Sequence, residues 1–497
     1  MSPINHDSKI LIVGSGVFGV STALWLARSG YRDVTVFDMQ DTYASGYDPG
    51  RGVDSASADL NKIIRFSYGD EIEYQKLAFQ AAEIWEQWNQ QIAAEDGSDL
   101  PDVFQKGSRK LWWNCGYLRM SETAEYDQFE LTTLENMKNE GIRDTQFMVD
   151  SQEDVARAAQ GGWSHKLDPC QRAERFGVHK AVLDSSAGFV VAYKSCAWAQ
   201  YLARKAGVKF VLHPTEGKVV KVDAGPDGKP SVRTADQKTH AGDLVIVSGG
   251  GWTPGLVPET EGLLETTAGS VATIHIPESR PDLRKRFSPE NFPVVTWSKS
   301  RGIYALPMTE GGDLKIGYRR TKYTNFGNVE GRRISVPKTA HVTDEKETNI
   351  TVEALDAIKG KQASLYTLAI DASTNKSPEF ISVNMPELAE IGVSSTKLCW
   401  YTDSIDNSFV IDFVPGKDRV LVCSGGSGHG FKFLPILGRE VVKIIEGDSK
   451  DGVYSQMWRW RDSGTQVKNG LEEGETGPRV LSNQNMASEA DWVFAKA

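Results

Sequence analysis

Cysteine is scarce in this chain of 497 residues. The number of cysteines is odd, and no two of them have CxxC spacing, which argues against a disulfide framework and against a zinc site. We therefore expect no metal and a reducing compartment such as the cytoplasm. The ending Ala-Lys-Ala is not the Ser-Lys-Leu peroxisomal signal, although a peroxisomal location stays open. The five cysteines are Cys115, Cys170, Cys196, Cys399 and Cys423.

An excess of basic residues is also missing. The chain carries 66 acidic and 56 basic residues, a formal net charge of −10. Because nucleic-acid binding needs a basic face to meet the phosphates, this balance argues against nucleic acid as a partner. The first ten residues also lack the basic segment and apolar stretch of a secretion signal.

One apolar run, at residues 10–27, is long enough to suggest a membrane span. Glycine and serine interrupt it at Gly14, Ser15, Gly16 and Gly19. A buried strand followed by a buried helix explains the run better, so we expect no membrane association. The overall composition, 40% hydrophobic and 25% charged, is typical of a soluble globular protein.

The start of the chain predicts a βαβ unit. Residues 9–13 form a short apolar run, residues 14–19 a glycine-rich turn, and residues 20–29 a helix that ends at Gly30. A second strand is predicted at residues 33–38. An opening of this length and order is typical of nucleotide-binding α/β folds.

The turn in this unit has the dinucleotide-binding pattern G-x-G-x-x-G. Gly14 permits the tight turn, Gly16 lets the backbone approach a pyrophosphate, and Gly19 allows helix and strand to pack closely. Asp38 ends the second strand, where an acidic side chain can bind the ribose hydroxyls. The hexapeptide alone is a weak signal, but both strands, the helix and the acid are in place. The pattern does not separate NAD from FAD.

The remaining chain is predicted from composition and periodicity. Residues 71–95 carry apolar side chains at steps of three and four, which predicts an amphipathic helix. At 497 residues the chain is too long for one core, because single cores stop growing near roughly 250–300 residues. The other predictions are a loop at 39–69, β-structure at 205–247 and 290–320, a surface insertion at 319–350, a strand at 420–423, and a polar extension after 446.

Four further blocks stand out when they are taken together. They are ADLNKIIR at 58–65 with YG at 68–69; GGGWTP at 249–254; Tyr304 with LKIGY at 314–318; and CWYTD at 399–403 with FVID at 409–412 and GGSGHGFK at 425–432. These blocks resemble the monomeric sarcosine oxidase family, which includes pipecolate oxidase, saccharopine oxidase and the fungal fructosyl amino acid oxidases. The resemblance covers about residues 9–445, and DLNKII and CWYTDS look closest to the fungal branch.

The resemblance implies an α/β fold with a discontinuous Rossmann-type FAD-binding domain and an α+β substrate domain with a mixed or antiparallel sheet. We expect the FAD-binding domain at 1–70, 185–260 and 395–445. We expect the substrate domain at 71–184 and 261–394, and a C-terminal extension at 446–497.

In this family a cysteine forms a thioether with the 8α-carbon of the flavin, and Cys399 matches that position. The other four cysteines are expected to be small buried hydrophobic residues. The resemblance and the fingerprint together imply cofactor contacts from Gly14, Gly16, Val17, Phe18, Gly19, Asp38, Asn61, Lys62, Arg65, Gly250, Trp252, Cys399, Gly426, Gly428, His429, Gly430, Phe431 and Lys432.

The resemblance also implies the chemistry. A secondary amine of an amino acid would lose a hydride equivalent to the flavin, and oxygen would become hydrogen peroxide. Lys315 matches the lysine that helps oxygen to accept electrons from the flavin. Lys62 matches a lysine beside the flavin, and Tyr304 matches an active-site tyrosine. Lys432 matches the lysine that binds the substrate carboxylate. We expect His429 to position its glycine turn rather than to act as a base.

The chain departs from the sarcosine enzymes at two places. Those enzymes carry Thr-Arg where this chain has Asn61-Lys62, and a histidine where it has Arg319. Arg319 could bind a second carboxylate of the substrate or could face solvent. Sarcosine, pipecolate, saccharopine, fructosyl amino acids and a specialised fungal amine all stay open as substrates.

Other readings of the sequence remain. The chain could be a flavin dehydrogenase with another electron acceptor, an NAD-dependent enzyme, or a non-catalytic relative. The leading reading is a monomeric oxidase whose partners are a small amine or amino-acid substrate and oxygen.

Overall fold

The computed structural model describes residues 4–47, 55–121, 123, 125–177, 179–224, 228–297, 302–338, 349–359, 380–447, 452–462 and 471–494. The first βαβ unit is present as predicted, and its helix α1 begins at Val17 rather than at residue 20. The helix starts earlier because Gly16 caps it in an extended conformation, and because the distant Ser57 Oγ accepts a hydrogen bond from Val17 N at 3.0 Å.

A six-stranded sheet carries this unit, in the order β21-β22-β13-β1-β2-β9. All of its neighbouring pairs are parallel except β21 with β22. Parallel strands buried on both faces read as continuous apolar runs, and strand β13 is fully buried. The strands are β1 (Lys9–Val13), β2 (Asp33–Asp38), β9 (Lys209–Leu212), β13 (Leu244–Val247), β21 (Val410–Phe413) and β22 (Val420–Ser424).

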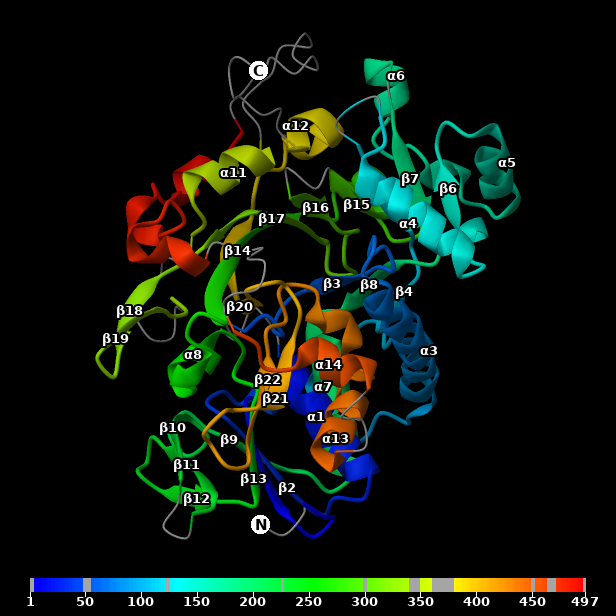
Figure 1. The fold of residues 1–497 in the computed structure, drawn as a ribbon. Coiled ribbons are helices and arrows are strands. Elements are labelled where there is room, and N and C mark those ends of the chain that lie inside the picture. The colour runs from blue at the N-terminus through cyan, green and yellow to red at the C-terminus, as the bar shows by residue number, and fades with distance from the viewer. Residues whose placement is uncertain are drawn as a thin grey trace.

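An eight-stranded mixed sheet forms the other half of the molecule, in the order β20-β14-β17-β16-β15-β5-β7-β6. Figure 1 shows it crossing the upper half, above the six-stranded sheet. Long antiparallel strands at its edge, β14 and β20, run down towards the smaller sheet. The strands are β5 (Tyr117–Met120), β6 (Gln146–Met148), β7 (Ala181–Asp184), β14 (Leu264–His275), β15 (Val294–Trp297), β16 (Ile303–Ala305), β17 (Asp313–Tyr323) and β20 (Ser395–Ser404).

Three small sheets complete the β-structure. The sheet β3-β8-β4 corrects the prediction of a loop at 39–69, because residues 61–64 form β3. Strand β3 pairs with β8, which lies more than 120 residues away in the sequence, so no local pattern predicts the pairing. The strands are β3 (Asn61–Ile64), β4 (Trp112–Trp113), β8 (Gly188–Val191), β10 (Val219–Ala224), β11 (Pro230–Thr234), β12 (Thr239–Ala241), β18 (Phe326–Val329) and β19 (Arg332–Ser335).

The main helices pack on one side of the six-stranded sheet, where α1, α7 and α13 lie together (Figure 1). The predicted amphipathic helix is present as α3, from residue 72 to residue 94. The helices are α1 (Val17–Arg28), α2 (Thr42–Ser45), α3 (Ile72–Ala94), α4 (Gln128–Asn139), α5 (Gln152–Gln160), α6 (Arg172–Phe176), α7 (Ala192–Lys205), α8 (Thr253–Leu256), α9 (Pro281–Arg286), α11 (Val352–Lys359), α12 (Phe380–Asn384), α13 (Leu437–Glu446) and α14 (Val453–Trp458).

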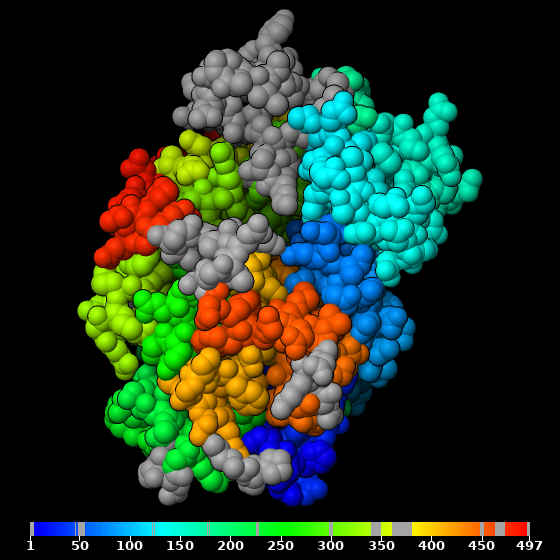
Figure 2. Space-filling view, in the orientation of Figure 1, coloured from blue at the N-terminus to red at the C-terminus, as the bar shows by residue number. Residues whose placement is uncertain are grey.

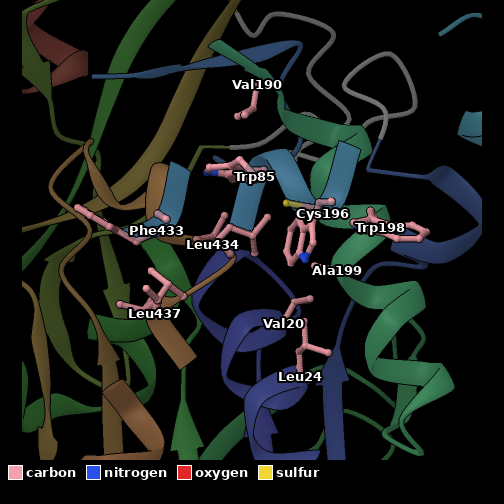
Figure 3. Close-up of a cluster of buried hydrophobic side chains, with 14 of the residues drawn as sticks. Val20, Leu24, Trp85, Val190, Cys196, Trp198, Ala199, Phe433, Leu434 and Leu437 are labelled. Carbon is pink, nitrogen blue, oxygen red and sulfur yellow. The ribbon is translucent and has the colours of Figure 1, made fainter. Parts of the chain in front are cut away.

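A shared apolar core joins these helices to the glycine-rich turn that precedes α13. Figure 3 shows Val20 and Leu24 of α1, Trp85 of α3, Trp198 of α7 and Phe433 of the turn converging in one cluster. The Nε1 of Trp85 donates a hydrogen bond to the backbone oxygen of Lys432 at 2.9 Å. Packing of the core thus fixes the turn that carries Lys432.

Parts of the segment after residue 446, which was predicted as a polar extension, pack against the body of the protein. Trp458 of α14 is fully buried, and its Nε1 donates to the hydroxyl of Tyr74 at 3.0 Å. Further on, Arg479 forms an ion pair with Glu265 of β14 at 2.9 Å. Figure 2 shows residues 471–494, in red, beside the yellow-green hairpin β18–β19.

The apolar run at residues 10–27 is divided between β1 and α1, as the glycines in it indicate. In the described part of the chain, no helix combines the length and the apolarity needed to cross a membrane. The α/β architecture with a second, mixed sheet confirms the predicted fold class.

Candidate active site

A large cavity of about 1740 Å³ lies between the two main sheets. It extends from the glycine-rich turn after β1 to the strands β17 and β20. Ligand pockets usually measure about 300–1,000 Å³, so this cavity has room for a large cofactor together with a substrate. Of the residues predicted for the site, Gly19 is the single one that does not line the cavity. It packs behind the turn, where a Cβ would lie 1.9 Å from the backbone oxygen of Gly14.

The glycine-rich turn forms one end of the cavity. Gly14 has a φ of +99°, and a Cβ at this position would lie 2.4 Å from the backbone oxygen of Ser248. Helix α1 starts directly after the turn, so its free N–H groups and positive dipole end face the cavity. The aromatic ring of Phe18 lies against Gly426 and Gly430, where a Cβ would approach it to 3.2 and 2.8 Å.

Asp38 lines the same end of the cavity. Its Oδ2 accepts hydrogen bonds from Ser15 N at 2.8 Å and from Ser15 Oγ at 3.1 Å. Burial raises the pKa of Asp38, and these hydrogen bonds oppose the increase. The carboxyl group of Asp38 is therefore hydrogen-bonded to the glycine-rich turn, at the position where the dinucleotide-binding pattern predicts the ribose.

The opposite end of the cavity contains a charged cluster. Lys315 of β17 and Lys62 of β3 both line the cavity, and each donates from Nζ to Oδ2 of Asp59 at 2.6 Å. Lys315 is 1% exposed and also donates to the backbone oxygen of Asn61 at 2.7 Å. Burial lowers the pKa of Lys315 to about 8, although Asp59 opposes the decrease.

Cys399 lies beside this cluster on β20, opposite Gly269 of β14. It lines the cavity and is 6% exposed. Its sulfur is 3.8 Å from the Nζ of Lys62. The structure thus brings together Lys62, Lys315 and Cys399, which come from three separate blocks of the sequence.

A chain of hydrogen bonds runs through the glycine-rich turn before α13. The Nζ of Lys432 donates to the Tyr68 hydroxyl at 2.8 Å, and this hydroxyl lies 3.2 Å from Nδ1 of His429. The Nε2 of His429 is 2.9 Å from the backbone oxygen of Asn407, which makes Nε2 the protonated nitrogen. Burial, and then the charge of Lys432, lower the pKa of His429 well below its usual value. His429 is thus a neutral link between the turn and its neighbours.

Cations gather next to Lys432. The guanidinium of Arg65 lies 4.5 Å from the ring centroid of Tyr68. Burial lowers the pKa of Lys432 well below its usual value, and the charges of Arg65 and Arg319 lower it further. This wall of the cavity can bind an anion, since an anion would relieve the repulsion among the three cations.

Arg319 does not face open solvent. Its Nε donates to the Tyr401 hydroxyl at 3.2 Å, and its terminal nitrogens donate to the backbone oxygens of Gly428 and Ser427 at 3.2 and 3.4 Å. Because every nitrogen already has a protein partner, Arg319 serves first to connect β17 with the glycine-rich turn. Tyr304 lies nearby on β16, over Gly317, where a Cβ would overlap its ring.

Three features in and around the cavity were not predicted from the sequence. Asp59 and Tyr68 stand inside a block that carries the family resemblance, but nothing local assigns them a role. The supposed surface insertion at 319–350 is partly wrong: β17 continues to Tyr323, and the hairpin β18–β19 contributes Asn328 and Val329 to the cavity wall. Residues 339–348 of that prediction lie outside the described residues.

The residues present fit FAD. A dinucleotide needs glycines without a side chain near its phosphates, and Gly14 and Gly16 provide them at the start of α1. Asn61 lines the cavity, and the buried nitrogen and oxygen of its side chain have no hydrogen-bond partner among the described residues. Buried polar atoms are nearly always paired, so these atoms are available to a ligand with both donors and acceptors.

Comparison with known proteins identifies the family of the chain. The model of the FAD dependent oxidoreductase (DAO) family matches residues 9–444. The L-saccharopine oxidase of Schizosaccharomyces pombe is 27% identical over 464 residues, covering 91% of this chain and 93% of that protein. The monomeric sarcosine oxidase of a Bacillus species is 23% identical over 439 residues, covering 88% of this chain and 91% of that protein.

Solved structures show the same fold. The fructosyl peptide oxidase from E. terrenum superposes with a TM-score of 0.75 at 22% identity, covering 98% of this chain and 99% of the other. The fructosamine oxidase Amadoriase II from Aspergillus fumigatus gives a TM-score of 0.68 at 22% identity, covering 99% of both chains. The family match over most of the chain, the fold and the dinucleotide site together confirm the resemblance found in the sequence: this chain belongs to the FAD dependent oxidoreductase family.

Proposed function

We propose that this enzyme oxidises the secondary amine of N-substituted amino acids and transfers the electrons to oxygen. The main support for this proposal is that four side chains line one cavity. Lys315 and Cys399 lie together in it, and the cations Arg65 and Lys432 lie on the adjoining wall. The names of the relatives, L-saccharopine oxidase and monomeric sarcosine oxidase, support the same class of substrate.

Bound FAD supplies the acceptor for a hydride equivalent from the α-carbon and the electrons that convert oxygen into hydrogen peroxide. The residues that would hold it are the glycine-rich turn at 14–19, Asp38 and the unpartnered Asn61. We propose that Cys399 attaches it covalently. The support is the exposure of this sulfur to the cavity and its position beside Lys62.

The cationic wall explains how the substrate can be oriented. Lys432 and Arg65 would bind its carboxylate, and Arg319 and Lys62 add further positive charge around the cavity. An ammonium group is disfavoured among these cations, so the site favours the neutral amine, which has the free electron pair that the reaction needs. Tyr304 lies on the same part of the wall as Lys62, and burial raises its pKa to about 12, so it stays a neutral hydroxyl at physiological pH.

The affinity for carboxylates should depend on pH through Lys432. Its pKa is low in the free site and rises when an anion binds beside it, so binding takes up a proton. The affinity for a carboxylate without an amine, such as acetate, should therefore be greatest at low pH. Above the pKa that Lys432 has in the ligand-free site, this affinity should fall by up to about tenfold per pH unit. Isothermal titration at several pH values measures this. In Lys432→Arg the affinity for acetate should depend less on pH. An unchanged pH dependence of this affinity in Lys432→Met would contradict the assignment.

A peroxide-coupled screen of N-substituted amino acids with the purified enzyme tests the function. We expect peroxide with at least one of N-methyl, cyclic, carboxyalkyl or fructosyl amino acids, and none with the matching primary amines. Turnover with a dye acceptor but without peroxide would identify a dehydrogenase instead. No turnover with either acceptor across the panel would refute the proposed substrate class.

We also propose that the chain is a monomer in the cytoplasm, built from the domains expected from the sequence. The six-stranded sheet supports this division, since its strands come from residues 9–38, 209–247 and 410–424, three separated parts of the chain. Gel filtration with light scattering tests the monomer.

A further inference from the structure

Asp59 occupies a special position behind the cavity wall. It is 2% exposed and does not itself line the cavity. One of its oxygens, Oδ2, accepts hydrogen bonds from both Lys315 and Lys62. The other oxygen, Oδ1, accepts from the backbone nitrogen of Leu60 at 2.8 Å, which fixes the orientation of the carboxylate.

The charges around Lys315 come from several elements. Asp59 and Lys62 face it from β3 and the residues before it, and Cys399 faces it from β20. Asp59 is the one carboxylate among them. Burial raises the pKa of Asp59, but the ammonium groups of Lys315, Lys62 and Lys397 outweigh burial and hold that pKa well below its usual value. Asp59 is therefore charged throughout the physiological range.

We propose that Asp59 is a positioning residue for the reduction of oxygen, which holds Lys315 in place on the cavity wall and keeps it positively charged. The inference rests on the proposed function in one respect, that Lys315 is the cation beside which oxygen is reduced. A buried lysine without an anion loses its proton readily. The positive charge of Lys62 lowers the pKa of Lys315 further, because like charges repel. Without Asp59, Lys315 would be neutral at physiological pH and could not stabilise negative charge that develops on oxygen.

The test uses the FAD-loaded enzyme reduced with dithionite and mixed with oxygen at pH 6 to 10, so no amine substrate is needed. The wild-type rate should fall as the pH rises through about 8, the pKa of Lys315. Asp59→Asn keeps the shape of the side chain but removes its charge. Its profile should shift to lower pH by at least about one unit, which makes it at least about fivefold slower at pH 8.

Acidification distinguishes positioning from a general defect. At low pH the rate of Asp59→Asn should recover, because Lys315 can still take up a proton, whereas Lys315→Met should stay slow at every pH. Asp154→Asn is the matched control: Asp154 is also buried between two cations, Arg143 and Arg157, but it lies outside the cavity. Its profile should equal that of the wild type. An unshifted profile in Asp59→Asn would overturn the proposal.

A second measurement needs neither cofactor nor turnover. In the FAD-free chain, unfolding takes up a proton at Lys315 between its folded pKa of about 8 and its usual value near 10.5, so Lys315 contributes a rise of the unfolding midpoint with pH in that window, measured as the difference between wild type and variant. In Asp59→Asn the rise should begin at lower pH. In Asp154→Asn it should not move, because arginine does not titrate there.

The two proposals can fail separately. If Asp59→Asn does not fold, the wild-type oxygen profile decides, and a rate that is flat from pH 6 to 10 refutes the role of Asp59. If the amine screen fails while the oxygen profiles behave as expected, the substrate class is wrong and the role of Asp59 stands.

Discussion

Replacing Lys315 with methionine is expected to slow the reaction with oxygen by about 10²- to 10³-fold, which corresponds to about 2.7–4 kcal/mol of activation free energy. The expected effect is large because the ammonium is 1% exposed and is held at the cavity wall by Asp59 and the backbone of Asn61. In such a desolvated place a positive charge acts on its surroundings far more strongly than in water. Methionine keeps the length of the side chain and removes the charge.

The measurement separates the two halves of the reaction. Anaerobic mixing with substrate follows the bleaching of the flavin, and mixing of the reduced enzyme with oxygen follows its return. We expect the first rate to change little and the second to fall. Lys166→Met is the matched control, because Lys166 is also a buried lysine bound to two backbone oxygens, those of Cys115 and Pro289, and it does not line the cavity. Equal slowing of both half-reactions in Lys315→Met would remove its assigned role.

Serine in place of Cys399 is expected to abolish the covalent attachment of the flavin completely. A hydroxyl oxygen is far less nucleophilic than a thiolate, so the bond to the 8α-carbon cannot form in its place. The wild-type chain should stay yellow after acid precipitation, and its intact mass should exceed that of the polypeptide by one FAD. Cys399→Ser should release its flavin into the supernatant.

Cys423 offers the matched control for this experiment. It lines the same cavity from β22 but lies beside Thr22, at the end where the glycine-rich turn is found. Cys423→Ser should therefore keep the adduct. A bare polypeptide mass for the wild type, or an adduct that persists in Cys399→Ser, would leave the covalent proposal without support.

The sequence predicted the parts of this site that depend on neighbours along the chain. The turn at 14–19, its two strands and Asp38 stand within 30 residues, and each has a backbone reason that can be recognised locally. The blocks around Lys315, Cys399 and Lys432 were recognised by resemblance. These predictions required no knowledge of which strands are neighbours in space.

Other features depended on contacts between distant segments. Asp59 has no recognisable role in its own block, because its partner Lys315 is 256 residues away. Arg319 was predicted either to bind the substrate or to face solvent; its hydrogen bonds to Tyr401 and the glycine-rich turn, beside the cavity, could not be read from the sequence. The hairpin β18–β19 looked like a polar insertion because its composition is polar, whereas its position beside the cavity depends on the strands next to it.

The sequence by itself determined that this chain binds a dinucleotide, that it belongs with the flavin-dependent oxidases, and which residue types its chemistry requires. The tertiary structure alone decided which of those residues meet: that two lysines share the carboxylate of Asp59, and that Lys432, Tyr68 and His429 form one chain of hydrogen bonds. The physical reason is distance. A motif fixes the backbone over a few residues, but the charge of a buried group is set by whatever folding brings within a few ångströms of it.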